Sequence, residues 1–206
     1  MLKQLGFLLL LGAGFAQAVE TDGIYAKLEM VQSSQVDYQI AIEEGKTRSL
    51  MCGYCHGKDG NSLKPDVPNL AGQNTKYLLK QIDLFANGVR KNYVMERLVK
   101  GISDEDRINL AVYFGAQPVV NAQPQVEGGK GKTIYQSYCF ACHGENGLGG
   151  DELPRVAGQP KEYLLKTLTA FKQGQSSRKN SPMVGIIQKV DAADIPALAA
   201  YIAGMR

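Results

Sequence analysis

Two short segments contain every cysteine and both histidines of this sequence. One reads Cys52-Gly53-Tyr54-Cys55-His56, and the other, 87 residues later, reads Cys139-Phe140-Ala141-Cys142-His143. In the pattern Cys-x-x-Cys-His the two thiols form thioether bonds to c-type haem, and the adjacent imidazole lies under the iron. Two copies of this pattern predict two covalently bound haem c groups, and so iron, in one chain.

Four cysteines in an exported protein have two other common uses. A pair of disulfides is common in exported proteins, but it leaves the placement of His56 and His143 unexplained. A zinc site would also leave both histidines unused, and it would have to bridge the 83 residues between Cys55 and Cys139. Haem attachment is therefore the favoured interpretation, with disulfides and zinc as the alternatives.

Each haem iron needs a second axial ligand, and methionine is the common choice where no further histidine exists. Met95 and Met183 lie 39 and 40 residues after the histidines of their motifs, at matching places in the sequence. Met51 adjoins a cysteine and Met205 is one residue from the end, so neither is well placed. We predict Met95 and Met183 as iron ligands; the alternative is that both only fill gaps in a core.

The rest of the chain repeats in the same order as the two motifs. Residues 68–73 (PNLAGQ) recur at 154–159 (PRVAGQ), and Tyr-Leu-Leu-Lys at 77–80 recurs at 163–166, both 86 residues later. A tandem duplication predicts two domains. We place them at 45–118 and 130–206, joined by a linker over 119–129 that has little charge and many turn-forming residues.

Each repeat has the pattern of a small helical domain. Apolar residues fall on one side of the predicted middle helices, and Ser103 with Asp106 resembles a helix-capping pair. No segment favours a strand. The fold class is therefore all-α, with each domain a small bundle around its haem. The expected helices span 38–51, 77–86 and a segment ending at 114 in the first repeat, and 130–138, 163–172 and a segment ending at 202 in the second.

The N-terminal segment has the features of an export signal. Lys3 precedes an apolar run over 5–15, and Ala16-Gln17-Ala18 fits a cleavage site. The run is too short to span a membrane, so we predict cleavage of residues 1–18, no membrane span in the mature chain and a periplasmic location. Residues 19–44 form an extension of unknown role, in which Ile24, Leu28 and Val31 are spaced for one face of a helix. We expect this face to pack on the chain's own domain; the alternative is packing on a partner.

Composition excludes several classes of protein. The chain has 206 residues, of which 44% are hydrophobic and 21% charged, so it is neither disordered nor fibrous. The formal net charge is +3 and no basic tract is present, so binding to nucleic acid is not expected.

The combined motifs resemble those of the two-haem class I cytochromes of the cytochrome c4 family. The resemblance covers residues 45–205. It implies two tandem cytochrome c domains, His/Met ligation at both irons and a role as a periplasmic electron carrier. It also implies that Pro68 and Pro154 lie beside the proximal histidines, whose Nδ1 protons their carbonyl oxygens would accept.

Three features depart from the family pattern. Met95 lacks the proline that precedes Met183. Arg48 stands where the second repeat has Tyr135, so an aromatic contact with the closing helix is expected to be missing from the first domain. The extension over 19–44 is longer than the family pattern.

The expected function is one-electron transfer with no catalytic residue, because an iron with both axial positions filled binds no substrate. Redox proteins are the expected partners, such as a terminal oxidase or a dehydrogenase. The alternative is the electron-accepting subunit of a periplasmic dehydrogenase, for example one that oxidises a sulfur compound. A haem peroxidase would need an open iron position, which Met95 and Met183 argue against.

Overall fold

The computed structural model describes residues 15–120, 124–125 and 128–206, with side chains from Gly23 onward. Within these ranges the fold is all-α, as predicted, and the only extended pairing is an isolated bridge between Gly150 and Leu153.

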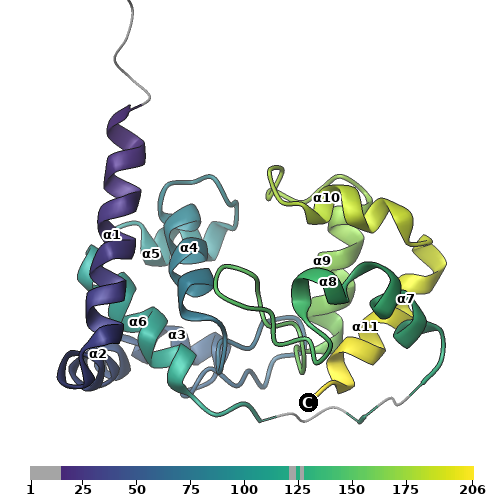
Figure 1. The fold of residues 1–206 in the computed structure, drawn as a ribbon, viewed down its shortest axis with the longest axis horizontal. Helices are drawn as coiled ribbons and strands as arrows, with labels where there is room; N and C mark the ends of the chain where they lie inside the picture. Colours follow the sequence, from purple (N-terminus) through teal and green to yellow (C-terminus); the bar gives the residue numbers. More distant parts are fainter. Residues whose placement is uncertain (1–14, 121–123, 126–127) are drawn as a thin grey trace, which may run out of the picture.

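Two helical units lie side by side (Figure 1). The first unit contains α1 (Phe15–Ser33), α2 (Gln35–Arg48), α3 (Leu50–His56), α4 (Thr75–Ala86), α5 (Tyr93–Val99) and α6 (Asp104–Ala116). The second contains α7 (Lys130–Tyr138), α8 (Phe140–His143), α9 (Lys161–Lys172), α10 (Met183–Ile186), the 3-10 turns η1 (Ile187–Lys189) and η2 (Ala192–Asp194), and α11 (Ile195–Gly204).

A glycine allows the two main helices of each unit to cross closely. A Cβ added to Gly45 in α2 would lie 2.1 Å from the Asn109 carbonyl oxygen of α6. A Cβ added to the equivalent Gly131 in α7 would lie 2.2 Å from the Ala197 carbonyl oxygen of α11. Each crossing borders a separate cluster of buried apolar side chains, so each unit has its own core.

The helix predicted over 38–51 is two helices. The first of them, α2, ends at Arg48, and the second, α3, begins at Leu50. Ser49 lies between them, and its hydroxyl donates to the Lys46 carbonyl oxygen at 2.8 Å. A serine hydroxyl can bond in this way to the carbonyl of the preceding turn, and the boundary between the two helices falls at this residue, before the first cysteine.

Other helix predictions agree with the structure to within a few residues. The helix over 130–138 is α7, and those over 77–86 and 163–172 are α4 and α9, each beginning two residues earlier. The Ser103 hydroxyl accepts from the Asp106 N–H at 3.1 Å, which confirms the predicted cap of α6. In the second unit η2 replaces this cap ahead of α11.

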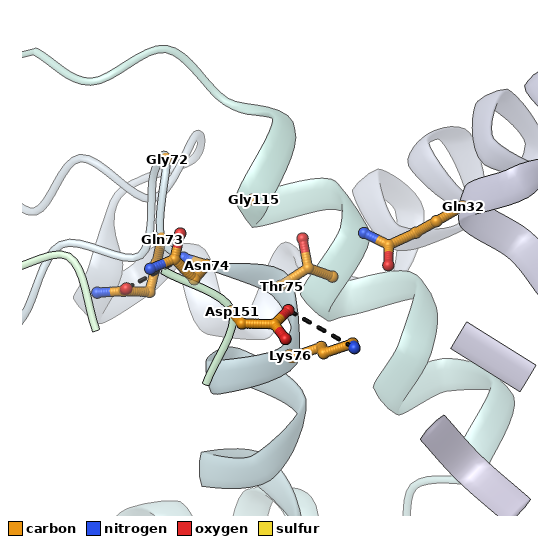
Figure 2. A pocket seen from close by; sticks show the side chains of 8 residues that line it. All are labelled: Gln32, Gly72, Gln73, Asn74, Thr75, Lys76, Gly115 and Asp151. Atoms are coloured by element: carbon orange, nitrogen blue, oxygen red, sulfur yellow. Dashed lines mark hydrogen bonds and ion pairs between the residues drawn. The ribbon is translucent and has the colours of Figure 1, made fainter. Parts of the chain in front are cut away.

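The N-terminal extension packs on the first unit, as predicted. Ile24 and Leu28 of α1 are buried in the first core cluster and Val31 packs against it. Glu29 also pairs with Lys76 at 3.1 Å, and Lys76 reaches Asp151 of the second unit at 3.6 Å. A pocket of about 280 Å³ lies at this junction. Figure 2 shows its lining, which comes from α1, the loop 72–74, α4, α6 and the loop that carries Asp151.

Arg48 replaces an aromatic contact with an ion pair. In the second unit Tyr135 packs on Tyr201 of the closing helix, with ring centroids 5.7 Å apart. In the first unit Arg48 reaches the closing helix through Asp106, with Nε 3.0 Å from the carboxylate. The aromatic contact is absent there, as the sequence predicted, but the two helices remain joined.

The predicted signal peptide lies outside the described residues except for its last four, which begin α1. Residues 121–123 and 126–127 of the predicted linker also lie outside them. In the described part of the chain, no helix is long and apolar enough to span a bilayer.

Candidate haem sites

Each Cys-x-x-Cys-His segment ends in a helix that a glycine terminates. His56 is the last residue of α3, and His143 is the last residue of α8. The following Gly57 and Gly144 have φ of +82° and +78°, where a side chain would be strained. A Cβ on Gly57 would also lie 2.1 Å from the Asn61 carbonyl oxygen. The chain therefore turns back sharply and brings the next loop under the histidine.

Both histidines make the same hydrogen bond. His56 Nδ1 lies 2.9 Å from the Pro68 carbonyl oxygen, and His143 Nδ1 lies 2.9 Å from the Pro154 carbonyl oxygen. A carbonyl oxygen only accepts, so Nδ1 carries the proton in each ring. Nε2 then has a free lone pair, which is the form of imidazole that binds a metal.

Burial favours the neutral form of both imidazoles. Loss of contact with water lowers the pKa of His56 and of His143 below the usual value, and the hydrogen bond to the proline carbonyl opposes this only in part. Neutral imidazole is the state in which histidine binds iron.

The four cysteines are free thiols in the structure. Cys52 packs against the first core cluster and Cys139 against the second. Burial raises the pKa of the Cys52 thiol, and it raises that of Cys139 to about 11. No disulfide joins these four cysteines in the structure. Among the described residues no three His, Cys, Asp or Glu side chains gather as a metal site, so zinc has no set of ligands there.

Met95 and Met183 occupy equivalent places in the two units. Met95 lies in α5 and packs, partly buried, against the core cluster that also receives Cys52. Met183 begins α10 and packs against the cluster that receives Cys139. Side chains fix both backbones: Met95 N–H donates to Asn92 Oδ1 at 3.0 Å, and Met183 N–H donates to Ser181 Oγ at 3.3 Å.

The segments that anchor the histidines also bind each other across the boundary between the units. Gln159 Oε1 accepts from Asn69 N–H at 2.9 Å, and its amide donates to the Asn69 carbonyl oxygen at 2.9 Å. Gln73 makes the same two bonds with the backbone of Arg155, at 2.7 and 2.8 Å. The four bonds are related by the repeat and are buried. Their backbone partners, Asn69 and Arg155, directly follow the prolines whose carbonyl oxygens bond to the histidines.

Sequence reasoning missed this pair of glutamines. Both stand at the end of the repeated PxxAGQ segments, and that repetition was the available signal. Hydrogen bonds between residues 90 positions apart leave no periodic pattern from which they could be inferred.

Comparison with known proteins shows to which family the chain belongs. A family model described as cytochrome c matches residues 129–206. A cytochrome c4 from Azotobacter vinelandii is 35% identical over 183 residues, which are 78% of this chain and 87% of the relative. This chain belongs to the cytochrome c4 family. The crystal structure of reduced recombinant cytochrome c4 from Pseudomonas stutzeri matches with a TM-score of 0.72 and 32% identity, covering 80% of this chain and 98% of that one.

Another relative of this cytochrome has a more specific name. A thiosulfate dehydrogenase electron acceptor from Stutzerimonas stutzeri (strain A1501) is 31% identical, over 89% of this chain and 93% of its own length. Membership of the family makes the present protein an electron-transfer protein of the cytochrome c fold rather than an enzyme.

The residues present fit covalent haem. Each unit offers two thiols, one imidazole with a free Nε2 and one partly buried thioether. These are the groups that c-type haem requires for attachment and for axial ligation by His and Met.

Proposed function

We propose that this cytochrome carries two haem c groups and passes single electrons between redox partners in the periplasm. Cys52 and Cys55 would attach the first haem and Cys139 and Cys142 the second. The observation that carries this proposal is the repeated hydrogen bond from a buried histidine to a proline carbonyl, 2.9 Å in both units. It prepares two imidazoles, His56 and His143, as proximal iron ligands.

Met95 and Met183 would supply the distal ligands. Their matched places and their backbone hydrogen bonds to Asn92 and Ser181 support this assignment. A haem ligated by His and Met exchanges one electron, and the thioether raises its reduction potential. The chain itself fixes the imidazole protons on Nδ1 and buries both rings.

The periplasmic location rests on the pattern of the N-terminal sequence, a charged start followed by an apolar run and Ala16-Gln17-Ala18. Cleavage after Ala18 would leave most of α1 in place, including the buried Ile24 and Leu28. N-terminal sequencing of the exported protein tests this directly: the expected first residue is Val19, and a start at Met1 would contradict it.

A second candidate function is electron acceptance from a periplasmic dehydrogenase that acts on a sulfur compound. The relative named a thiosulfate dehydrogenase electron acceptor favours it, because it matches 89% of this chain. Reduction of the cytochrome by thiosulfate in the presence of purified thiosulfate dehydrogenase tests this candidate. Reduction without an added mediator is expected, and its absence would leave the general carrier.

The ligand assignment is tested by Met95→Ala and Met183→Ala, with Met30→Ala as the matched control because Met30 is 62% exposed on α1. Each of the first two variants is expected to lose the weak far-red band of Met-ligated ferric haem at one haem only, and to bind cyanide quickly there. The control should have the parent spectrum. A Met95→Ala or Met183→Ala spectrum with both bands intact would remove that methionine from the assignment.

A further inference from the structure

The two units share a plan but differ on the surface around their haem-binding segments. At four positions the first unit exposes a large apolar side chain where the second unit has a small or polar residue. The exposed residues are Leu50, Tyr54, Tyr93 and Val94, between 52% and 78% exposed. The matching residues are Ser137, Ala141, Ser181 and Pro182. The second unit exposes apolar side chains at other positions of its segments, namely Tyr138, Phe140 and Leu148, so charge distinguishes the two surfaces more clearly than apolar exposure does.

Charge follows the same division. Segments 50–64 and 91–100 of the first unit contain five basic and two acidic residues, a net charge of +3. The matching segments 137–151 and 179–188 of the second unit contain one basic and two acidic residues, a net charge of −1. Lys58 and Lys64 are replaced by Glu145 and Asp151, so the difference includes changes of sign.

These apolar and basic residues lie next to the groups assigned to the first haem. Tyr54 stands between the two cysteines, and Tyr93 and Val94 directly precede Met95. The Lys64 amine lies 3.6 Å from Cys55 Sγ, and the Arg97 guanidinium lies 4.1 Å from the centre of the Tyr93 ring. Because Cys52 and Met95 pack against the same core cluster, the two segments flank one site.

We propose that segments 50–64 and 91–100 form the surface on which a negatively charged redox protein docks to the first unit. Basic residues steer an acidic partner, and a small apolar contact is enough for the short-lived complexes of electron transfer. Cys52, Cys55, His56 and Met95 would hold the first haem beside this surface, and that haem would supply the exchange of one electron with the partner's redox centre. This inference rests on the proposed function, and it assigns this partner to the first unit.

The charge of the surface is tested by the double variant Lys58→Glu/Lys100→Glu. The matched control, Lys161→Glu/Lys189→Glu, changes the net charge equally on exposed residues of the second unit. Stopped-flow kinetics would follow oxidation of the reduced protein by hexacyanoferrate(III), with charge −3, and by tris(phenanthroline)cobalt(III), with charge +3. Each oxidant accepts one electron from a ferrous haem.

At low ionic strength we expect the first-unit variant to react about three- to tenfold more slowly with the anionic oxidant and correspondingly faster with the cationic one. The control should change less than about twofold, and both differences should vanish in about 1 M salt, where charges are screened within about 3 Å. Equal effects in the two variants, or effects independent of salt, would overturn the proposal.

A second measurement uses the unaltered protein and does not depend on the variants. Hexacyanochromate(III) is a redox-inert, paramagnetic anion that broadens the NMR signals of nearby amides. We expect broadening in segments 50–64 and 91–100 and little in 137–151 and 179–188. The reverse pattern would contradict the inference even if both haems were present and ligated as proposed, whereas failure of the proposed function would appear in the haem spectrum itself.

Discussion

Gln73 and Gln159 join the two units through buried side-chain hydrogen bonds. Each side chain satisfies a backbone N–H and a backbone carbonyl of the opposite unit at a buried position. A buried polar group that loses its partner costs more free energy than the hydrogen bond contributed, because it stays out of contact with water.

We therefore expect Gln159→Ala to lower the free energy of unfolding by about 1–3 kcal/mol. Chemical denaturation of the haem-loaded protein measures this. Gln175→Ala is the control, because Gln175 is exposed and should change stability by less than about 0.5 kcal/mol. Equal stability of the two variants would show that the buried bonds do not join the units.

The helix-crossing glycines give a second prediction at this scale. Gly131→Ala would place a methyl group 2.2 Å from the Ala197 carbonyl oxygen and 2.8 Å from Tyr201 Cβ. We expect a loss of about 1–3 kcal/mol or more, because α7 and α11 must separate. Gly101→Ala meets no atom within 4 Å and is the control. Thermal unfolding distinguishes them, and a parent-like melting temperature for Gly131→Ala would contradict the close crossing.

At the scale of elements, α1 extends the first unit in a way that the second unit lacks. Its apolar face enters the first core cluster, and its Glu29 joins Lys76, which also pairs with Asp151 across the boundary. Exposed ion pairs contribute little, so packing accounts for most of the stability that α1 adds.

Leu28→Ala is expected to cost about 2–5 kcal/mol, because Leu28 is fully buried and its removal leaves a cavity. The loss should fall on the first unit. Calorimetry of the haem-loaded protein would then show the transition of the first unit at a lower temperature, while Met30→Ala, at an exposed site of the same helix, would leave it in place. A Leu28→Ala protein as stable as Met30→Ala would mean that α1 does not pack on the core.

Some features of these helices could be predicted from the sequence, and others could not. Repeated spacing was sufficient to predict the all-α fold, the boundaries of α7 and the packing of Ile24 and Leu28, because these follow from local periodicity. It could not predict the break at Ser49 or the ion pair between Arg48 and Asp106. Both depend on which backbone or side-chain partner a polar group meets after folding.

The same distinction applies to the candidate sites. The motif predicts which histidines bind haem, since the residue types themselves carry that chemistry. The hydrogen bonds to Pro68 and Pro154 were expected only through the family resemblance, and the structure gives them equal lengths in both units. The two glutamines needed the structure, because their partners lie in the other unit.

At the scale of the whole molecule, two similar units are joined through the segments that anchor their histidines. The path from His56 to Pro68, Asn69 and Gln159 is matched by the path from His143 to Pro154, Arg155 and Gln73. A displacement of one unit relative to the other would therefore disturb both histidine anchors. The surfaces around the two haem-binding segments differ in net charge, so the two units do not present the same face to partners.

The central claim is that one chain carries two haems of the same ligation. Its most direct test is the visible spectrum of the purified protein, oxidised and reduced, with covalent haem quantified per chain. We expect two haems per chain, both low-spin, both with the far-red band of methionine ligation, and neither binding carbon monoxide or cyanide quickly. A single haem per chain, or one high-spin haem that binds these ligands at once, would contradict the account.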